Sequence, residues 1–232
     1  MISVSHLRES IYKDCYFSEV AGSFTVQNEE NAAAGVLTQV ELLSKGRFIC
    51  ISNKILKESA EIYKKIEKKP NGFSFRMDCD GICLLNIDDR NYLLIIEVKS
   101  GYNDVKKKGI SQIVASYVKM RSILQSIEGY TPADYEELGL LVSYPPSHKT
   151  NIPETSLIEV KKEIVAPSDI DKANNANSTK LRVDKEVLLN LNDYLISACH
   201  VNSTMYNPSL HIKHVSVTDQ VNEETINLDS YL

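Results

Sequence analysis

The strongest pattern in the chain consists of two apolar runs, residues 82–85 and 92–98, that flank the polar stretch NIDDRN. This pattern predicts two antiparallel strands joined by a tight turn. Because side chains alternate along a strand, Glu97 and Lys99 share one face at the end of the second strand. The turn brings Asp80, which stands just before the first strand, beside that end. We therefore expect Asp80, Glu97 and Lys99 to converge.

The rest of the chain alternates between helical and strand-like spacing of its apolar residues. Helices are expected over four segments: residues 29–44, 53–68, 105–128 and 183–198. Strands are expected over five further segments: residues 20–26, 48–51, 73–77, 139–143 and 157–165. The predicted fold class is α/β, a mixed β-sheet flanked by helices, with the core order αβββαβ. We expect one domain over residues 1–232, with its core at about 28–144 and a C-terminal extension at about 150–232.

Asp80, Glu97 and Lys99 form a chemically specific trio. Two carboxylates a few ångströms apart repel each other, and a divalent cation that prefers oxygen ligands, such as Mg²⁺, relieves this repulsion. A lysine beside such an ion can orient or deprotonate a bound water, or neutralise charge that develops on a phosphate. Asp80 and Glu97 are therefore candidate ligands of Mg²⁺, for which Mn²⁺ is a substitute, and Lys99 is a candidate catalytic residue.

The spacing of this trio resembles the motif of the PD-(D/E)XK nuclease superfamily, which includes restriction endonucleases and many repair nucleases. Asp80-Gly81-Ile82 and the later run IIEVK, which ends at Lys99, match the motif, and Cys79 stands where a proline is often found. The resemblance covers about residues 28–144. It implies a restriction endonuclease-like fold and the hydrolysis of DNA phosphodiester bonds to 5′-phosphate and 3′-hydroxyl ends.

The resemblance also indicates further site residues on helices. Many members carry a polar residue, often glutamine, on the helix that follows the motif, and Gln112 lies on the helix predicted there. A first helix often adds an acidic residue, for which Glu29, Glu30 and Glu41 are candidates. For each of these three the alternative is a charge at the start or flank of a helix that takes no part in the site.

A structural alternative exists for the trio itself. In this alternative Glu97 and Lys99 lie at a solvated strand end with a cross-strand ion pair. Such an exposed pair contributes little to the free energy of unfolding. The chain contains its own comparison, because residues 158–161 repeat the tetrapeptide IEVK. That copy has no aspartate opening an apolar strand at hairpin distance before it. The difference in context favours an active site at the first copy.

Composition and charge limit the partners that the protein can have. Of the 232 residues 43% are hydrophobic, which is ordinary for a globular protein. The formal net charge is −5, so contacts with DNA must come from local groups such as the lysines at 106–108, although a solvated surface explains such lysines equally well. Five irregularly spaced cysteines indicate reduced thiols and a cytoplasmic location. No apolar run is long enough for a membrane span.

These observations lead to one expected function with alternatives. We expect a Mg²⁺-dependent deoxyribonuclease of the type II restriction endonuclease kind, a homodimer that cuts double-stranded DNA. A repair, junction-resolving or toxin nuclease on the same fold is one alternative, and a catalytically inactive nucleic-acid-binding relative is another. The C-terminal extension forms either a dimer contact or a DNA-specificity element. Its His211 and His214 do not have the spacing of a common zinc site.

Overall fold

The computed structural model describes residues 1–11, 16–28, 36–61, 74–100, 108–144, 164–165, 182–191, 201–217 and 221–232. Its α-helices are α1 (Val4–Ser10), α2 (Lys54–Ala60) and α4 (Ile110–Gln125). Its strands are β1 (Phe17–Gln27), β2 (Gln39–Ile51), β3 (Gly81–Ile87), β4 (Arg90–Lys99), β5 (Tyr135–Ser143), β6 (Ile164–Val165), β7 (Arg182–Asn190), β8 (Ser209–Ser216) and β9 (Glu223–Asn227). Short 3₁₀ helices are η4 (Pro132–Asp134), η6 (Ser203–Met205) and η7 (Leu228–Ser230).

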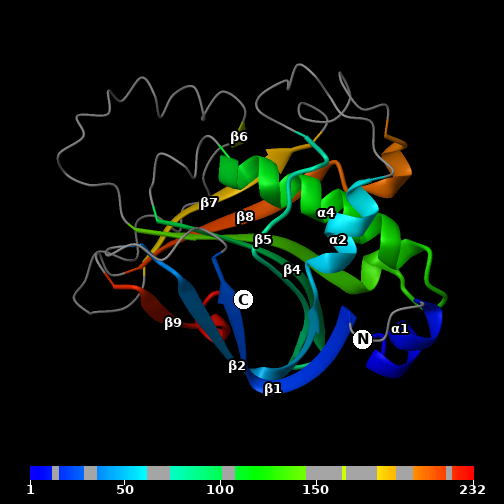
Figure 1. The fold of residues 1–232 in the computed structure, drawn as a ribbon, viewed down its shortest axis with the longest axis horizontal. Coiled ribbons are helices and arrows are strands. Elements are labelled where there is room, and N and C mark those ends of the chain that lie inside the picture. Colours follow the sequence, from blue (N-terminus) through cyan, green and yellow to red (C-terminus); the bar gives the residue numbers. More distant parts are fainter. Residues whose placement is uncertain are drawn as a thin grey trace.

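The strands form one mixed sheet (Figure 1). Its order is β1-β2-β3-β4-β5-β8-β7-β6, and β9 joins it by pairing in parallel with β2. Neighbours from β1 to β4 are antiparallel, whereas β4, β5 and β8 run parallel to one another. Two parallel neighbours need a crossover connection, and α4 lies in the one between β4 and β5. The expected class, a mixed sheet flanked by helices, is confirmed.

The predicted hairpin is present as β3 and β4. Ile87 pairs with Arg90, which leaves Asp88 and Asp89 as a two-residue turn. Both turn residues have positive φ values, 46° and 65°. Positive φ at both central positions is the requirement of a type I′ turn, whose twist matches that of the flanking strands. The polar stretch in the sequence therefore corresponds to a two-residue connection.

Replacing Asp89 by glycine is expected to raise the free energy of unfolding by about 0.5–1 kcal/mol. Glycine adopts a positive φ without the steric cost that other residues have there, and this gain exceeds its larger loss of backbone entropy. Urea unfolding of the two proteins measures the difference. Asp89→Ala is the control and is expected to be less stable than the parent. A glycine variant less stable than the parent would contradict the argument from strain.

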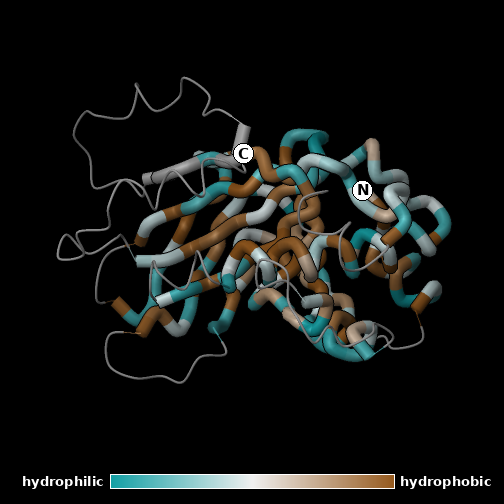
Figure 2. The backbone as a smooth tube through the Cα atoms, turned by 90° about the horizontal axis from the view of Figure 1, so that it is seen from above, coloured by the Kyte–Doolittle hydropathy of each residue, from teal (hydrophilic) through white to brown (hydrophobic). Residues whose placement is uncertain are grey.

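The two faces of the sheet are buried against different partners. On one face α1, α2 and α4 cover the strands, with Leu7, Leu56 and Val114 fully buried there. On the other face a second core includes Val40 of β2 and Leu94 of β4, and it is closed by the curvature of the sheet and by η7. Figure 2 shows the apolar strand segments running through the middle of the molecule. The sheet therefore separates two hydrophobic cores.

Two predicted helices and one predicted strand are wrong. Residues 39–44, the end of the helix expected at 29–44, belong to β2, and residues 29–35 lie outside the described ranges. Residues 183–190 of the helix expected at 183–198 belong instead to β7, and residues 192–198 lie outside the described ranges. Both segments pair with strands distant in sequence, and such pairing overrides local helical spacing. The first helix of the expected αβββαβ order is therefore absent from residues 39–44. The strand expected at 73–77 is also wrong, because Phe75 lies in a turn.

Other predicted elements are present with different ends. Described helices α2 and α4 are shorter than the segments 53–68 and 105–128, parts of which lie outside the described ranges. Strands β1, β2 and β5 are longer than expected. Of the strand expected at 157–165, only β6 is described. The C-terminal segment contributes β8 and β9, which pair with β5 and β2.

The structure bears on the cysteines and on the question of a membrane span. The cysteines whose side chains are described, Cys50, Cys79 and Cys83, are free thiols, as expected. Within the described ranges no helix has the length and the apolar character needed to cross a membrane.

Candidate functional site

Asp80 lies where the pairing of β3 with β4 ends. β3 begins at Gly81 opposite Ile96, so β4 extends past the end of β3. Asp80 continues the contact, because its N–H donates to Ile96 O at 3.1 Å and its Oδ2 accepts a hydrogen bond from Val98 N–H at 2.8 Å. These bonds hold the Asp80 carboxylate against the end of β4. Asp80 therefore lies beside the end of β4 that carries Glu97 and Lys99, as the sequence predicted.

Glu97 and Lys99 form a buried ion pair. Lys99 Nζ lies 2.6 Å from Glu97 Oε1, and the two side chains are 5% and 0% exposed. Neither carboxylate oxygen of Glu97 receives a hydrogen bond of ordinary geometry from the described residues. The expected alternative of a solvated strand end is therefore wrong as to exposure, since both charges lie inside the protein. Burying two charges is costly, so the pair needs a reason beyond surface solubility.

Gly109 explains how the pair comes to be covered. A Cβ atom on Gly109 would lie 2.9 Å from Leu141 Cδ1, 3.7 Å from Glu97 Cγ and 3.9 Å from Lys99 Cγ. The residue before α4 therefore packs directly on the pair, at a distance that glycine permits best. The start of α4 shields Glu97 from water and lowers the local dielectric constant around it.

The pKa of Glu97 is raised well above its ordinary value. Burial is the largest cause, the nearby Asp80 carboxylate raises the pKa further, and Lys99 acts in the opposite direction. A buried carboxylate beside a second carboxylate favours the approach of positive charge. The Lys99 ammonium supplies one such charge in the structure. A divalent cation would satisfy the same electrostatic demand.

The free energy of unfolding is expected to fall more steeply with rising pH in the parent than in Glu97→Gln. Because the pKa of Glu97 is raised by folding, its stabilising contribution is complete below pH about 4.5 and is lost as pH rises through the folded-state pKa. The slopes should differ by at most about 1.4 kcal/mol per pH unit. Urea unfolding between pH 5 and 8 measures both slopes. Equal slopes would contradict a raised pKa at Glu97.

Gln112 bonds to the segment before Asp80 and not to Asp80, Glu97 or Lys99 in the described contacts. Its Nε2 donates to Asp78 O at 2.9 Å, and its buried Oε1 has no hydrogen-bond partner in the described ranges. Gln112 therefore binds the segment that leads into Asp80. Glu41 lies in β2 between Thr25 and Thr225, not on a helix as expected. Two further candidates, residues 29 and 30, lie outside the described ranges.

Two more polar residues of α4 escaped the sequence analysis. Ser116 and Lys119 follow Gln112 by four and seven positions, so all three share one helix face, and both are fully or nearly fully buried. Ser116 Oγ accepts from Cys79 N–H at 2.8 Å, and Lys119 binds Asp78. The polar spacing at 112, 116 and 119 was the available signal, and the apolar stripe on the same helix concealed it.

The C-terminal segment adds a buried serine–histidine pair beside Lys99. Ser143 of β5 is the register partner of Lys99 on β4, and its Oγ lies 2.9 Å from His214 Nε2 on β8. The same Oγ lies 2.9 Å from Tyr144 O. Both contacts are satisfied when Ser143 donates to the carbonyl and His214 donates through Nε2–H. With this tautomer His214 donates to Ser143 and does not act as a base toward it.

His211 and His214 do not converge. They are three residues apart on β8, so their side chains point to opposite faces of the sheet. His211 Nδ1 lies 3.2 Å from Glu186 Oε1 at the surface, whereas His214 is buried. The two imidazoles therefore do not face a common point.

The donor set near β4 suits Mg²⁺ better than a transition metal. Within the described ranges no three His, Cys, Asp or Glu side chains group closely enough to hold a metal ion. Asp80 and Glu97 are a pair of carboxylates, and Mg²⁺ is commonly bound through one or two carboxylates together with waters and substrate phosphates. The buried, poorly bonded carboxylate of Glu97 fits this requirement.

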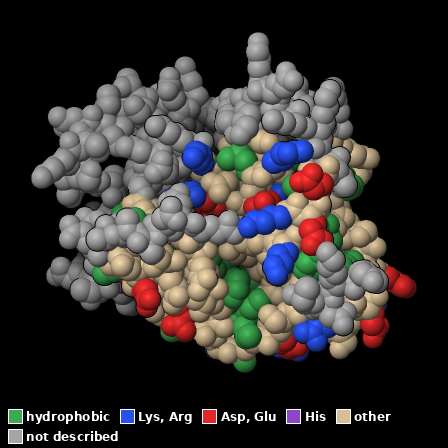
Figure 3. Space-filling view, in the orientation of Figure 1, with side chains coloured by type: hydrophobic (Ala, Val, Ile, Leu, Met, Phe, Trp, Pro, Cys, Tyr) green, Lys and Arg blue, Asp and Glu red, His purple; other side chains and the backbone are tan. Residues whose placement is uncertain are grey.

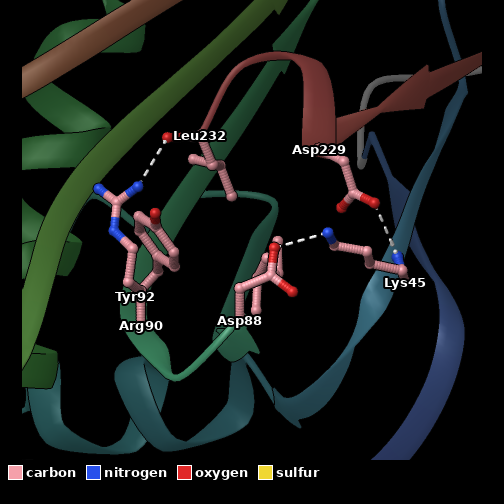
Figure 4. Close-up of a pocket in the computed structure, with 7 residues that line it drawn as sticks. Lys45, Asp88, Arg90, Tyr92, Asp229 and Leu232 are labelled. Carbon is pink, nitrogen blue, oxygen red and sulfur yellow. Dashed lines mark hydrogen bonds and ion pairs between the residues drawn. The ribbon is translucent and has the colours of Figure 1, made fainter.

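A hollow at the other end of β4 is unrelated to the trio (Figure 4). Lys45 Nζ lies 2.5 Å from Asp88 Oδ2 in this hollow. The backbone N–H of Lys45 donates to Asp229 Oδ2 at 3.1 Å. Arg90 Nη1 donates to the Leu232 carbonyl at 3.3 Å. The first and last residues of β4 are separated by about 30 Å along an extended strand. The polar groups of this hollow pair with one another and lie far from the candidate site.

Comparison with protein-family models, with curated proteins and with solved structures gave no match for this chain.

Proposed function

We propose that this protein is a Mg²⁺-dependent deoxyribonuclease with a restriction endonuclease-like core of the PD-(D/E)XK type. One observation carries the proposal: Asp80 meets the buried Glu97–Lys99 pair at the end of a single hairpin. The order of elements supports it, because the hairpin is followed by α4 and then by β5, which lies parallel to β4. A strand end built for solubility would not bury both charges.

Asp80 and Glu97 would hold Mg²⁺ in this proposal. When bound, Mg²⁺ offsets charge on the phosphate and lowers the pKa of a coordinated water. Lys99 orients the attacking water and adds positive charge next to the phosphate as negative charge develops there. Because the start of α4 excludes bulk water from Glu97 and Lys99, their electrostatic effects are larger than at a surface.

The contact with DNA would rest on individual cations more than on one basic patch. Figure 3 shows Lys and Arg side chains lying among Asp and Glu side chains on the face that carries α2 and α4. The formal net charge of −5 also disfavours binding of DNA through the overall charge of the surface. We propose a cytoplasmic homodimer of the type II restriction kind acting on double-stranded DNA, since one chain carries one site and a duplex needs two cuts. A repair, junction-resolving or toxin nuclease is the alternative subtype.

Digestion of mixed plasmid and genomic DNA tests the proposal. The parent is expected to cut in Mg²⁺ or Mn²⁺ and not in excess chelator, and Asp80→Asn is expected to be inactive under all conditions. Discrete bands would support a restriction enzyme, whereas a metal-dependent smear would support the repair or toxin subtype. Electrophoresis of the ends after phosphatase treatment checks for 5′-phosphates.

A nucleic-acid-binding protein without catalysis makes opposite predictions. Under that alternative the parent cuts no DNA in any metal, and calorimetry detects no binding of Mg²⁺ or Mn²⁺. Asp80→Asn would then change only the free energy of unfolding, through the lost charge at the Val98 N–H. Absence of both cleavage and metal binding in the folded parent would refute the nuclease proposal.

A further inference from the structure

Residues 77–79, which lead into Asp80 and β3, are held largely by side chains, whereas Asp80 N–H itself donates to Ile96 O of β4. Residues 77–79 have no strand pairing, so their backbone groups need other partners. Three come from one face of α4: Lys119 Nζ donates to Met77 O at 3.0 Å, Gln112 Nε2 donates to Asp78 O at 2.9 Å, and Ser116 Oγ accepts from Cys79 N–H at 2.8 Å. The helix thus fixes three successive residues before Asp80.

A side chain from α2 completes this arrangement on the other side of the segment. Asn53, at the start of α2, donates through Nδ2 to Cys79 O and to Asp80 O, each at 2.8 Å. α2 packs beside α4 on the same face of the sheet (Figure 1). Asn53 at the start of α2 and Ile96 O of β4 therefore hold the backbone of Asp80, and α4 holds the three residues before it. The Asp80 carboxylate accepts from Val98 N–H.

Lys119 is the least expected member of this arrangement. Its side chain is 0% exposed and forms an ion pair with Asp78, whose side chain is 16% exposed. Burial lowers the pKa of Lys119, although Asp78 opposes this effect. Apolar side chains of similar volume in place of both Lys119 and Asp78 would avoid the desolvation cost and would often give a protein of equal or greater stability. Packing alone therefore does not account for a lysine here.

The Lys119 ammonium also restrains the backbone that leads into Asp80. It binds both the carbonyl of Met77 and the carboxylate of Asp78, so it fixes the chain two and three residues before Asp80. A shift of this segment would move Asp80 away from Val98 and away from Glu97. Partners that hold the ligands of a metal typically change metal affinity 10–100-fold when they are removed.

We propose that Lys119, through Asp78 and the segment 77–80, is a positioning residue that fixes the Asp80 carboxylate on Val98 N–H and sets the affinity of the site for a divalent cation. The first part stands on the described contacts alone. The second part rests on the proposed nuclease function, because it requires Asp80 to be a metal ligand.

The experiment compares Lys119→Met with the parent by two measurements. The first is amide hydrogen exchange by NMR, taken as the ratio of the Val98 rate to the Leu94 rate, since both amides are in β4 and the ratio cancels a general loss of stability. We expect the ratio to rise at least 10-fold in the variant. The second is calorimetric titration with Mn²⁺, for which we expect binding about 10–100-fold weaker.

Arg121→Met is the matched control. Arg121 lies on the same helix and forms a buried ion pair, with Nε 2.7 Å from Glu137 Oε1, but that partner belongs to β5 and not to the segment 77–80. The control loses a buried pair and should keep the parent's exchange ratio and Mn²⁺ affinity. Lys119→Arg should recover part of both effects. If Lys119→Met does not fold, Asp78→Asn, which removes the partner charge at a partly exposed side chain, replaces it in both measurements.

The outcomes separate this inference from the proposed function. An unchanged exchange ratio in Lys119→Met, or the same change in Arg121→Met, overturns the positioning role. A parent that binds no Mn²⁺ overturns the metal part and the nuclease proposal, while the exchange ratio still decides whether Lys119 fixes Asp80. A raised ratio with unchanged Mn²⁺ affinity overturns the link between the segment and the metal.

Discussion

Lys99→Met is expected to lower the rate of Mg²⁺-dependent DNA cleavage about 1,000-fold or more, while the protein still folds. The ammonium of Lys99 is the positive group closest to Glu97 among the described contacts, and it lies in a site from which α4 excludes water. Removing one preorganised electrostatic group from such a site typically costs about 10²–10³-fold in rate, and loss of water positioning adds to this. Methionine keeps the packing of the aliphatic stem.

Single-turnover cleavage at saturating Mg²⁺ measures this effect, and thermal unfolding establishes that the variant is folded. Lys45→Met is the matched control, because Lys45 forms an ion pair at the opposite end of the hairpin and its side chain is 58% exposed. Loss of an exposed pair changes little, so Lys45→Met should cut at nearly the parent rate. Cleavage by Lys99→Met within tenfold of the parent would remove Lys99 from the catalytic step.

Arg121→Met is expected to lower the free energy of unfolding by about 3–5 kcal/mol. Glu137 is nearly fully buried, accepts from Tyr117 Oη at 2.5 Å and pairs with Arg121 at 2.7 Å. Burial raises the pKa of Glu137, and Tyr117 and Arg121 oppose that rise. Without Arg121 the carboxylate remains inside the protein with its charge uncompensated. The cost of that buried charge, more than the lost attraction, causes the expected loss of stability.

Urea unfolding in a double-mutant cycle measures the coupling between the two residues. Arg121→Met/Glu137→Leu removes both charges and should recover a large part of the stability that Arg121→Met loses, with a coupling energy of about 1–3 kcal/mol. Arg90→Met is the surface control, since its pair with Glu136 is exposed and its loss should change stability little. A double variant no more stable than Arg121→Met would show that the pair is not the source of the effect.

The hairpin and its trio were predictable because every signal for them is local. A polar stretch between two apolar runs predicts β3 and β4, and alternation along β4 places Glu97 and Lys99 on one face. The turn then brings Asp80 to the same end. Burial of the Glu97–Lys99 pair was not predictable, because it depends on how closely Gly109 approaches β4 from the next element.

Residues 39–44 and β7 show where local spacing misleads. Val40 and Leu43 fit a helical stripe, whereas Val40 and Leu42 alternate with the more exposed Glu41 and Leu43 as in a strand, so both periods match this short run. Pairing with β1 and β9 decides between them. The choice at β7 likewise depends on pairing with β8, more than twenty residues later in the chain for most of its length.

The sequence by itself determined a mixed α/β chain, one tight hairpin and the three charged residues that the hairpin brings together, because each follows from the spacing of neighbouring residues. Tertiary structure alone decided that the Glu97–Lys99 pair is buried, that β8 brings His214 to Ser143 beside Lys99, and that Lys119 holds the segment before Asp80. These features depend on contacts between separate elements, such as Lys119 with Met77, 42 positions apart, and His214 with Ser143, 71 positions apart. Local periodicity carries no information about such contacts, and the packing of α4 and β8 against the sheet establishes them.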